Sequence, residues 1–259
     1  MASPTANPPT ESRLSTRISL RWLPEPASET TDTIVMSVKG WYVDLRVDKK
    51  SGDIDWAIAG QRVVDSSDPH RVQFTHEIDS HNSFDDVDCG TFTTLPNGDD
   101  LETGSMSRPD LPGAPVTEYE EVWRELRFKE GPEGPGRGVS WVLESKHDIE
   151  LREDEEVEVS RTFLARIWGT YLVVRQKQVY VRSAFAGSTD AVVKAGKGVS
   201  ARREEWDSST GWSAKYILGL EGDSLPCAKD VEANEQLRAP GGTVLVRGEP
   251  YTVRSYEVV

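Results

Sequence analysis

The segment at residues 76–81, which reads HEIDSH, holds the densest set of side chains in the chain that could do chemistry. On a β-strand, alternate side chains point to opposite faces, so Glu77, Asp79 and His81 share one face. Carboxylate and imidazole groups can ligate a metal ion, but three ligands from a single strand fit the tetrahedral geometry of zinc poorly. We therefore interpret this face as a solvated polar surface and predict neither a metal ion nor another cofactor.

Two residues of this segment are candidate catalytic groups. His76 lies on the apolar face with Phe74 and Ile78, where it could act as a general acid or base. The simpler alternative is a core histidine bonded to a neighbour. Asp79 could be a carboxylic acid that an apolar pocket keeps protonated, able to donate a proton to a leaving hydroxyl group. Its simpler alternative is a turn aspartate that caps residues 80–82.

A set of aromatic residues forms a candidate substrate-binding surface: Trp41, Trp56, Tyr119 and Trp123. Tryptophan at alternate strand positions fills the interior of many small barrels, whereas a hollow barrel uses the same rings to line a cavity. Both alternatives stay open, since one barrel can be filled while another is hollow. In a hollow barrel, Tyr42 is the expected orienting group, and Arg46 is a third catalytic candidate as a hydrogen-bond donor to the substrate.

Composition restricts the class of protein and its partners. The chain has 259 residues, 36% of them hydrophobic, and a formal net charge of −14. This acidic balance disfavours nucleic acid and anionic membrane surfaces, and no apolar run is long enough to cross a bilayer. Only Cys89 and Cys227 are present and residues 1–16 lack the apolar run of a signal peptide, so a reducing, cytoplasmic location is expected. The motifs GxSxG, GxxxxGK[ST], GxGxxG after a strand and HExxH are absent, which leaves hydrolase, kinase and nicotinamide-enzyme functions without support.

Short alternating runs separated by turns predict an all-β protein. Residues 33–38 and 41–47 form one hairpin around Gly40, and in the second strand Trp41 and Val43 face away from Tyr42 and Asp44. Residues 118–128 fit a helix or a strand, and we favour a strand because the neighbouring segments are strands. A short helix is expected only near residues 228–237.

The Gly- and Pro-rich residues 130–138 predict a linker between two domains. We assign residues 1–16 to a disordered tail, 17–129 to an N-terminal β-barrel and 139–259 to a C-terminal β-barrel. Two tandem barrels are favoured because closure removes exposed strand edges, and a pair of sandwiches is the competing architecture.

Several blocks of sequence resemble the fungal Hri family, whose members are lipocalin-like two-barrel proteins. They read RWLPEPASE at 21–29, DLR at 44–46, DWAIAG at 55–60, IDS at 78–80 and EYEEVWR at 118–124, with a similar closing segment at 242–258. The resemblance is clearest over residues 17–128. It implies two lipocalin-like barrels, which agrees with the break at 130–138.

For function, the resemblance implies a small-molecule-binding barrel of fungal secondary metabolism. Some relatives look like hetero-Diels–Alderases of tropolonic sesquiterpenoid pathways, which dehydrate a hydroxymethyl tropolone to a quinone methide and add it to a humulene-type alkene. Such an enzyme must exclude water and orient its reactants. The alternatives are a family member that binds a protein partner, which is how the founding yeast protein is known, and a metabolite carrier. The expected ligand is an apolar small molecule, and the oligomeric state stays open, with a homodimer as one alternative.

Overall fold

The computed structural model describes residues 10–85, 87–108, 110–147, 149, 151–152, 155–183, 191–232 and 239–259. Within these ranges the protein is almost entirely β-structure, which confirms the predicted all-β class. The first half contributes nine strands: β1 (Ser12–Trp22), β2 (Thr31–Val38), β3 (Trp41–Asp48), β4 (Ile54–Val64), β5 (Arg71–Phe74), β6 (Ile78–Asp79), β7 (Asp88–Thr94), β8 (Asp100–Ser107) and β9 (Val116–Glu125).

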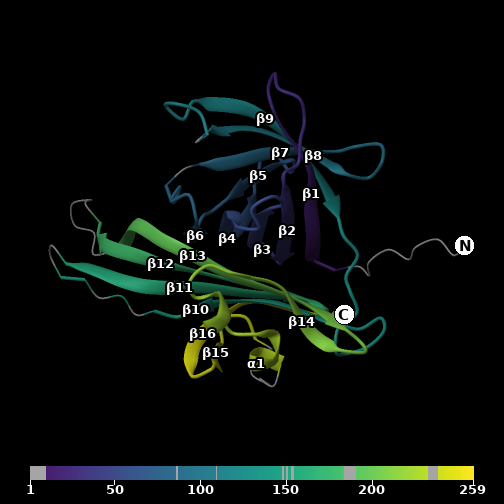
Figure 1. The fold of residues 1–259 in the computed structure, drawn as a ribbon, viewed down its shortest axis with the longest axis vertical. Helices are drawn as coiled ribbons and strands as arrows, with labels where there is room; N and C mark the ends of the chain where they lie inside the picture. Colours follow the sequence, from purple (N-terminus) through teal and green to yellow (C-terminus); the bar gives the residue numbers. More distant parts are fainter. Residues whose placement is uncertain are drawn as a thin grey trace, which may run out of the picture.

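Eight of these nine strands form a closed antiparallel barrel (Figure 1). The sheet runs in the order β3-β2-β1-β9-β8-β7-β5-β4-β6, and a further ladder between β3 and β4, with Tyr42 opposite Gly60, closes the ring. The two-residue strand β6 pairs with β4 beside the barrel wall. Strand β9 confirms a strand over residues 118–125 of the ambiguous segment at 118–128, because its side chains alternate between the two faces of the wall, whereas residues 126–128 lie beyond its end.

The second half forms a seven-stranded antiparallel sheet in the order β14-β13-β12-β11-β10-β16-β15. In the described ladders β14 and β15 are its outer strands, so this half is a sheet beside a barrel and not a second closed ring. Its elements are β10 (Val139–Ser145), β11 (Glu156–Ile167), β12 (Thr170–Arg182), β13 (Ala191–Asp207), β14 (Gly211–Leu218), a 3-10 turn (Gly222–Ser224), α1 (Ala228–Glu232), β15 (Thr243–Val246) and β16 (Glu249–Val258).

The main hydrophobic core lies between the outer wall of the barrel and one face of the second sheet. Strand β3 contributes Val43, Leu45 and Val47, and the sheet contributes side chains such as Phe163 and Leu172. Burial of this apolar surface holds the two sheets together. The two halves therefore share a core and form two layers of one packing unit.

A second core covers the opposite face of the sheet, where α1 and β15 lie in Figure 1. It contains Trp141, Tyr171 and Trp212 together with Val231 of α1 and Val244 of β15. The space that a second barrel could have enclosed is thus filled by the protein's own side chains. Of the two alternatives for the aromatic residues, a filled interior or a hollow one, the second half of the chain shows the filled interior.

Three sequence boundaries change in the structure. Strand β1 begins at Ser12, so residues 12–16 belong to the barrel and not to the predicted tail. Helix α1 covers residues 228–232 of the helix expected at 228–237, and the remainder lies outside the described residues. The linker at 130–138 lies between β9 and β10, where no strand is present.

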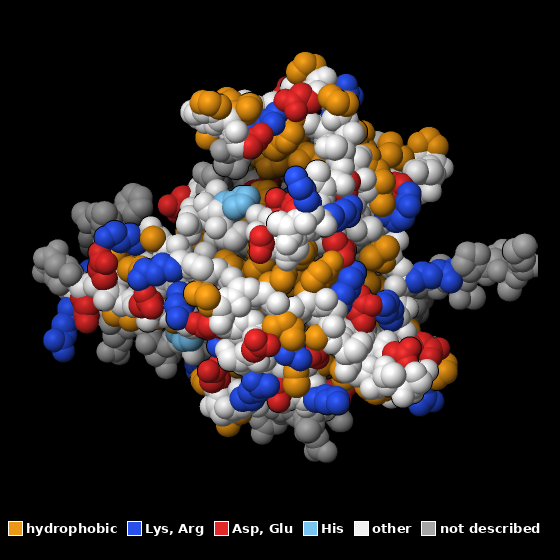
Figure 2. All heavy atoms as spheres, viewed as in Figure 1, with side chains coloured by type: hydrophobic (Ala, Val, Ile, Leu, Met, Phe, Trp, Pro, Cys, Tyr) orange, Lys and Arg blue, Asp and Glu red, His pale blue; other side chains and the backbone are white. Residues whose placement is uncertain are grey.

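The surface carries charges of both signs. Figure 2 shows Lys and Arg side chains interspersed with Asp and Glu over the visible face. In the described part of the chain, no helix combines the length and the hydropathy needed to span a membrane.

Candidate functional site

Strand alternation directs polar and aromatic side chains into the interior of the barrel. In β3, Tyr42, Asp44 and Arg46 point inward because their neighbours Val43 and Leu45 pack against the second sheet. They line a cavity of about 100 Å³, which we call the lumen. Its walls are formed by Arg13, Ser15, Val35, Ser37, Tyr42, Asp44, Arg46, Trp56, Ile58, Arg62, Phe74, Asp88, Phe92, Asp100, Glu102, Met106, Tyr119, Glu121, Trp123 and Glu125.

The lumen runs from a solvent-exposed mouth to a buried floor. At the mouth, the side chains of Arg13 and Glu125 are 45% and 47% exposed. At the floor, the side chains of Asp44 and Glu121 are each 4% exposed. Burying a charged group costs free energy unless a group of opposite charge pairs with it. Buried charged groups in a cavity are typical of functional sites, so the floor is a candidate site.

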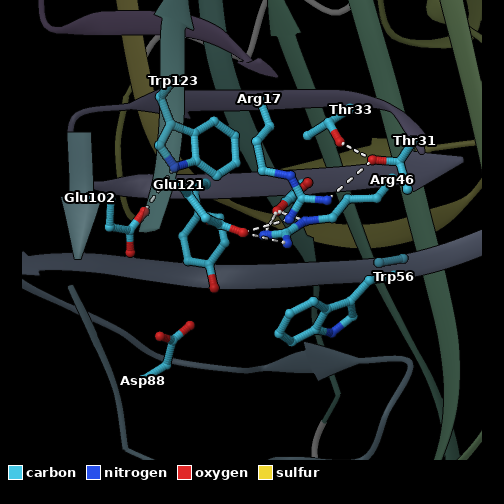
Figure 3. Close-up of polar contacts among 12 residues, drawn as sticks. Arg17, Thr31, Thr33, Arg46, Trp56, Asp88, Glu102, Glu121 and Trp123 are labelled. Atoms are coloured by element: carbon cyan, nitrogen blue, oxygen red, sulfur yellow. Dashed lines mark hydrogen bonds and ion pairs between the residues drawn. The ribbon is translucent and has the colours of Figure 1, made fainter. Parts of the chain in front are cut away.

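A buried ion network occupies the floor (Figure 3). Arg17 donates to Glu121 at 2.5 Å and to Glu29 at 2.7 Å. Arg46 donates twice to Asp44 Oδ2, at 3.0 Å through Nε and at 2.9 Å through Nη2, and lies 3.6 Å from Glu121. Two arginines and three acids are thereby paired with one another at this end of the barrel.

Arg46 also lies between two indole rings. Its guanidinium carbon is 4.7 Å from the centroid of Trp56 and 5.7 Å from that of Trp123. Both distances fall in the range of cation–π attraction. Arg46 therefore fixes the orientation of the two tryptophans that line the lumen.

One oxygen of the floor has no hydrogen-bond partner. Asp44 is 3% exposed, and its Oδ1 atom accepts no bond although Arg46 engages Oδ2. Burial raises the pKa of Asp44, against the lowering effect of Arg46. An unpaired buried acceptor on a residue of the cavity wall is an exception to the usual pairing of buried polar groups, and it marks this end of the lumen as a place where a hydrogen-bond donor would be stabilising.

Glu102 of β8 is a buried acid on the opposite part of the wall. Its Oε1 accepts from the Tyr119 hydroxyl at 3.0 Å and its Oε2 from Trp123 Nε1 at 2.9 Å. Burial, with the negative charges of Glu121 and Asp88, raises the pKa of Glu102 to about 8. Glu102 is therefore a protonated acid at neutral pH and can serve as a proton donor inside the lumen.

Two glycines make room for this acid and its partner. A Cβ atom at Gly90 would lie 2.2 Å from Glu102 Oε1, and one at Gly104 would lie 2.7 Å from the Tyr119 hydroxyl oxygen. Side chains at these positions would displace Glu102 or Tyr119. The two glycines thus allow both groups to lie flat against the barrel wall.

Five of the predicted site residues line the lumen: Tyr42, Arg46, Trp56, Tyr119 and Trp123. Trp41 does not. It lies on the outer face of the barrel, where its ring stacks on Phe163 at 6.1 Å and under Arg254 at 4.9 Å. Because Trp41 and Tyr42 are neighbours on one strand, only one of them can face the interior.

His76 and Asp79 form a buried pair beneath Trp56, outside the lumen wall. His76 Nδ1 lies 2.7 Å from Asp79 Oδ2, and Nε2 lies 3.2 Å from Asp88 Oδ2. Burial alone would lower the pKa of His76, but these two carboxylates raise it to about 9. His76 is therefore protonated near neutral pH and is poorly suited to act as a general base there.

Asp79 is ionised and fully engaged. Its Oδ1 accepts from Trp56 Nε1 at 2.9 Å and from the His81 backbone N–H at 2.7 Å. Burial opposes ionisation, but the hydrogen bond and charge of His76 lower the pKa of Asp79. The expected protonated acid is consequently absent at this position. Within the described ranges, no group of three or more His, Cys, Asp or Glu side chains forms a candidate metal site.

Six acids of the lumen were not predicted from the sequence: Asp44, Asp88, Asp100, Glu102, Glu121 and Glu125. A signal was present in two strands, because Asp44 lies midway between Tyr42 and Arg46, and Glu121 midway between Tyr119 and Trp123. Residues two apart on a strand share a face, so each acid had to accompany the aromatic residues that were assigned to the interior.

Comparison with known proteins identifies the family. A family model described as Protein HRI1 matches residues 13–254. The chain belongs to the HRI1 family. A fold similar to that of this chain is present in a crystal structure of an uncharacterized protein, YLR301w from Saccharomyces cerevisiae, with a TM-score of 0.65. The identity is 18%, over 95% of this chain and 99% of that chain. No curated protein matches the sequence.

Proposed function

We propose that the barrel of this HRI1-family protein binds a compact small molecule in its lumen. The observation that carries the proposal is a cavity of about 100 Å³ whose wall includes Asp44, a buried acid with one unpaired oxygen. Native proteins pair nearly all buried polar groups. A buried acceptor without a partner beside a cavity therefore favours the binding of a molecule that carries a hydrogen-bond donor.

The size of the lumen restricts the ligand. A dry cavity of about 150 Å³ holds one benzene ring, whereas drug-sized ligands occupy about 300 to 1,000 Å³. A cavity of about 100 Å³ therefore fits a molecule of roughly one ring. The indoles of Trp56 and Trp123 and the ring of Phe92 provide apolar surface for it.

The test is a titration of ¹⁵N-labelled protein with benzyl alcohol, benzylamine and benzoate, observed at the tryptophan indole N–H signals. We expect at least one of these one-ring probes to shift the signals of Trp56 and Trp123 and to leave that of Trp41 unchanged, because Trp41 lies outside the barrel. If none of the three probes shifts the lumen indoles, the proposal is wrong.

A matched pair of variants locates the binding. Ser15 lies on the lumen wall, whereas Thr103 is exposed on the outer face of β8. We expect Ser15→Phe to fill the cavity and abolish the shifts, and Thr103→Phe to retain them. Shifts that persist in Ser15→Phe would place the probe elsewhere.

The second candidate function is the hetero-Diels–Alderase activity implied by the family resemblance, and Glu102 is the observation that favours it. The dehydration needs an acid in a water-poor site, and Glu102, with its raised pKa, meets this need where Asp79 does not. In this scheme Glu102 protonates the hydroxyl of the hydroxymethyl group. The C–O bond breaks, water leaves, and the tropolone hydroxyl returns a proton to Glu102, which leaves a neutral quinone methide. Cycloaddition to the alkene then forms one C–C and one C–O bond without proton transfer.

The size of the lumen places this function second, since a tropolone and a humulene exceed about 100 Å³ and the barrel would have to widen. Incubation of the protein with a hydroxymethyl tropolone and humulene tests it. The hypothesis predicts faster, stereoselective product formation than in buffer, lost in Glu102→Gln. Equal rates and a racemic product would exclude the activity and leave ligand binding untouched.

A further inference from the structure

The lumen contains more negative than positive groups. Its wall includes six acidic side chains, at positions 44, 88, 100, 102, 121 and 125, against three arginines, at positions 13, 46 and 62. Glu102 is protonated at neutral pH, so the other five acids face the three arginines. Two cations outside the lining, Arg17 and His76, contact Glu121 and Asp88, but each is also paired with an acid outside the lining, Glu29 and Asp79. The wall therefore keeps a surplus of negative charge, which favours a bound cation over a bound anion.

The wall also offers a specific acceptor and apolar surface. Asp44 Oδ1 requires a donor, and a carboxylate bonded by a charged donor forms a stronger hydrogen bond than one bonded by a neutral donor. The rings of Trp56, Trp123, Tyr119 and Phe92 surround the same space, as Figure 3 shows for the two tryptophans. Aromatic faces attract cations and also pack against the hydrocarbon part of a ligand.

We propose that the ligand of the lumen is a compact organic ammonium ion, whose N–H donates to the Asp44 carboxylate while its apolar body packs against the aromatic wall. This inference rests on the proposed binding function and specifies its ligand class. It differs from the apolar ligand that the sequence predicted, because the apolar face of β3 turned out to pack outside the barrel.

Glu102 supplies a further constraint. Groups from several strands surround it: Glu121 and Tyr119 on β9, Asp88 at the start of β7, Arg46 on β3 and Arg62 on β4. Because burial and the neighbouring acids raise its pKa to about 8, Glu102 contributes little negative charge at neutral pH. Ionisation of Glu102 at higher pH makes the lumen more attractive to an ammonium ion.

Isothermal titration with the same three probes, at fixed ionic strength, tests the ligand class. Benzylamine stays a cation near neutral pH, benzyl alcohol is its neutral counterpart and benzoate is an anion. We expect benzylamine to bind about 10- to 100-fold more tightly than benzyl alcohol, and benzoate to bind least. Equal binding of benzylamine and benzyl alcohol, or tightest binding of benzoate, would overturn the ammonium assignment while lumen binding itself stands. No binding of any probe would remove both.

Two variants identify the groups responsible. Asp44→Asn should cost most of the preference for benzylamine over benzyl alcohol, whereas Glu118→Gln, at an exposed position of β9 outside the lumen lining, should retain it. A preference that survives Asp44→Asn in a folded variant contradicts the assigned contact.

The pH dependence gives a second readout that does not depend on Asp44→Asn folding. From about pH 6.5 to about pH 8.5, where benzylamine remains protonated, its affinity should rise in the native protein and stay flat in Glu102→Gln. An affinity that is flat or falls in the native protein is incompatible with a cation beside Glu102.

Discussion

Replacement of His76 by Asn tests whether the buried His76–Asp79 pair is structural. The His76 side chain is 3% exposed and the Asp79 side chain is fully buried, with 2.7 Å between Nδ1 and Oδ2. Breaking a buried pair by removing one partner typically costs about 3 to 5 kcal/mol. We therefore expect His76→Asn to lower the free energy of unfolding by about this amount at about pH 6, where the pair is fully charged.

The pH dependence of this loss of stability shows whether the His76–Asp79 pair is charged. The pKa of His76 is raised from 6.5 to about 9 in the folded protein, a difference worth at most about 3 kcal/mol. Because the folded pKa lies above the unfolded one, this stabilisation is fully present below pH 6.5 and disappears as the pH rises through about 9. The difference between native and variant stability should therefore shrink across that window.

Urea unfolding, followed by tryptophan fluorescence and circular dichroism at several pH values, measures the difference. Glu102 also loses stabilising protonation in part of this range, because its pKa is raised from 4.5 to about 8. We therefore compare Glu102→Gln with the double variant Glu102→Gln/His76→Asn. Because both proteins lack the Glu102 carboxyl group, its titration does not contribute to the difference between them. A stability difference that stays constant from about pH 6 to about pH 9 would refute a charged His76–Asp79 pair.

Two further predictions concern the core and the lumen wall. Leu45→Ala, in the core between barrel and sheet, should lower the free energy of unfolding by about 2 to 5 kcal/mol. The same change at the fully exposed Leu220 is the control and should alter it by less than about 0.5 kcal/mol. Urea unfolding measures both. Gly104→Ala should destabilise the protein by about 1 to 3 kcal/mol, because the new Cβ would lie 2.7 Å from the Tyr119 hydroxyl oxygen. Gly198→Ala is the control, since nothing lies within 4 Å of its added Cβ, and equal effects of the two glycine variants would contradict the described packing of Tyr119.

The all-β fold could be predicted because alternation with period two is a local property of each strand. The hairpin around Gly40 and the strand at β9 follow directly from it. The arrangement of the second half could not be predicted, because it depends on the long-range packing of α1 and β15 on one face of the sheet. Nothing in the strand pattern alone distinguishes a closed barrel from a sheet whose face is covered in this way.

The orientation of the strands was the hardest part of the site to predict. In β3 the alternation separates Trp41, Val43 and Leu45 correctly from Tyr42 and Asp44. An apolar face usually points to the interior of its own barrel, but here it packs against a second sheet, and the polar face lines the lumen. Only the presence of that second sheet decides which face is enclosed.

A crystal structure of the protein grown with benzylamine tests the central claim most directly. We expect density for one probe molecule inside the barrel, with its nitrogen within hydrogen-bonding distance of the Asp44 carboxylate. A lumen that contains only ordered water at a probe concentration that saturates binding in solution would contradict it.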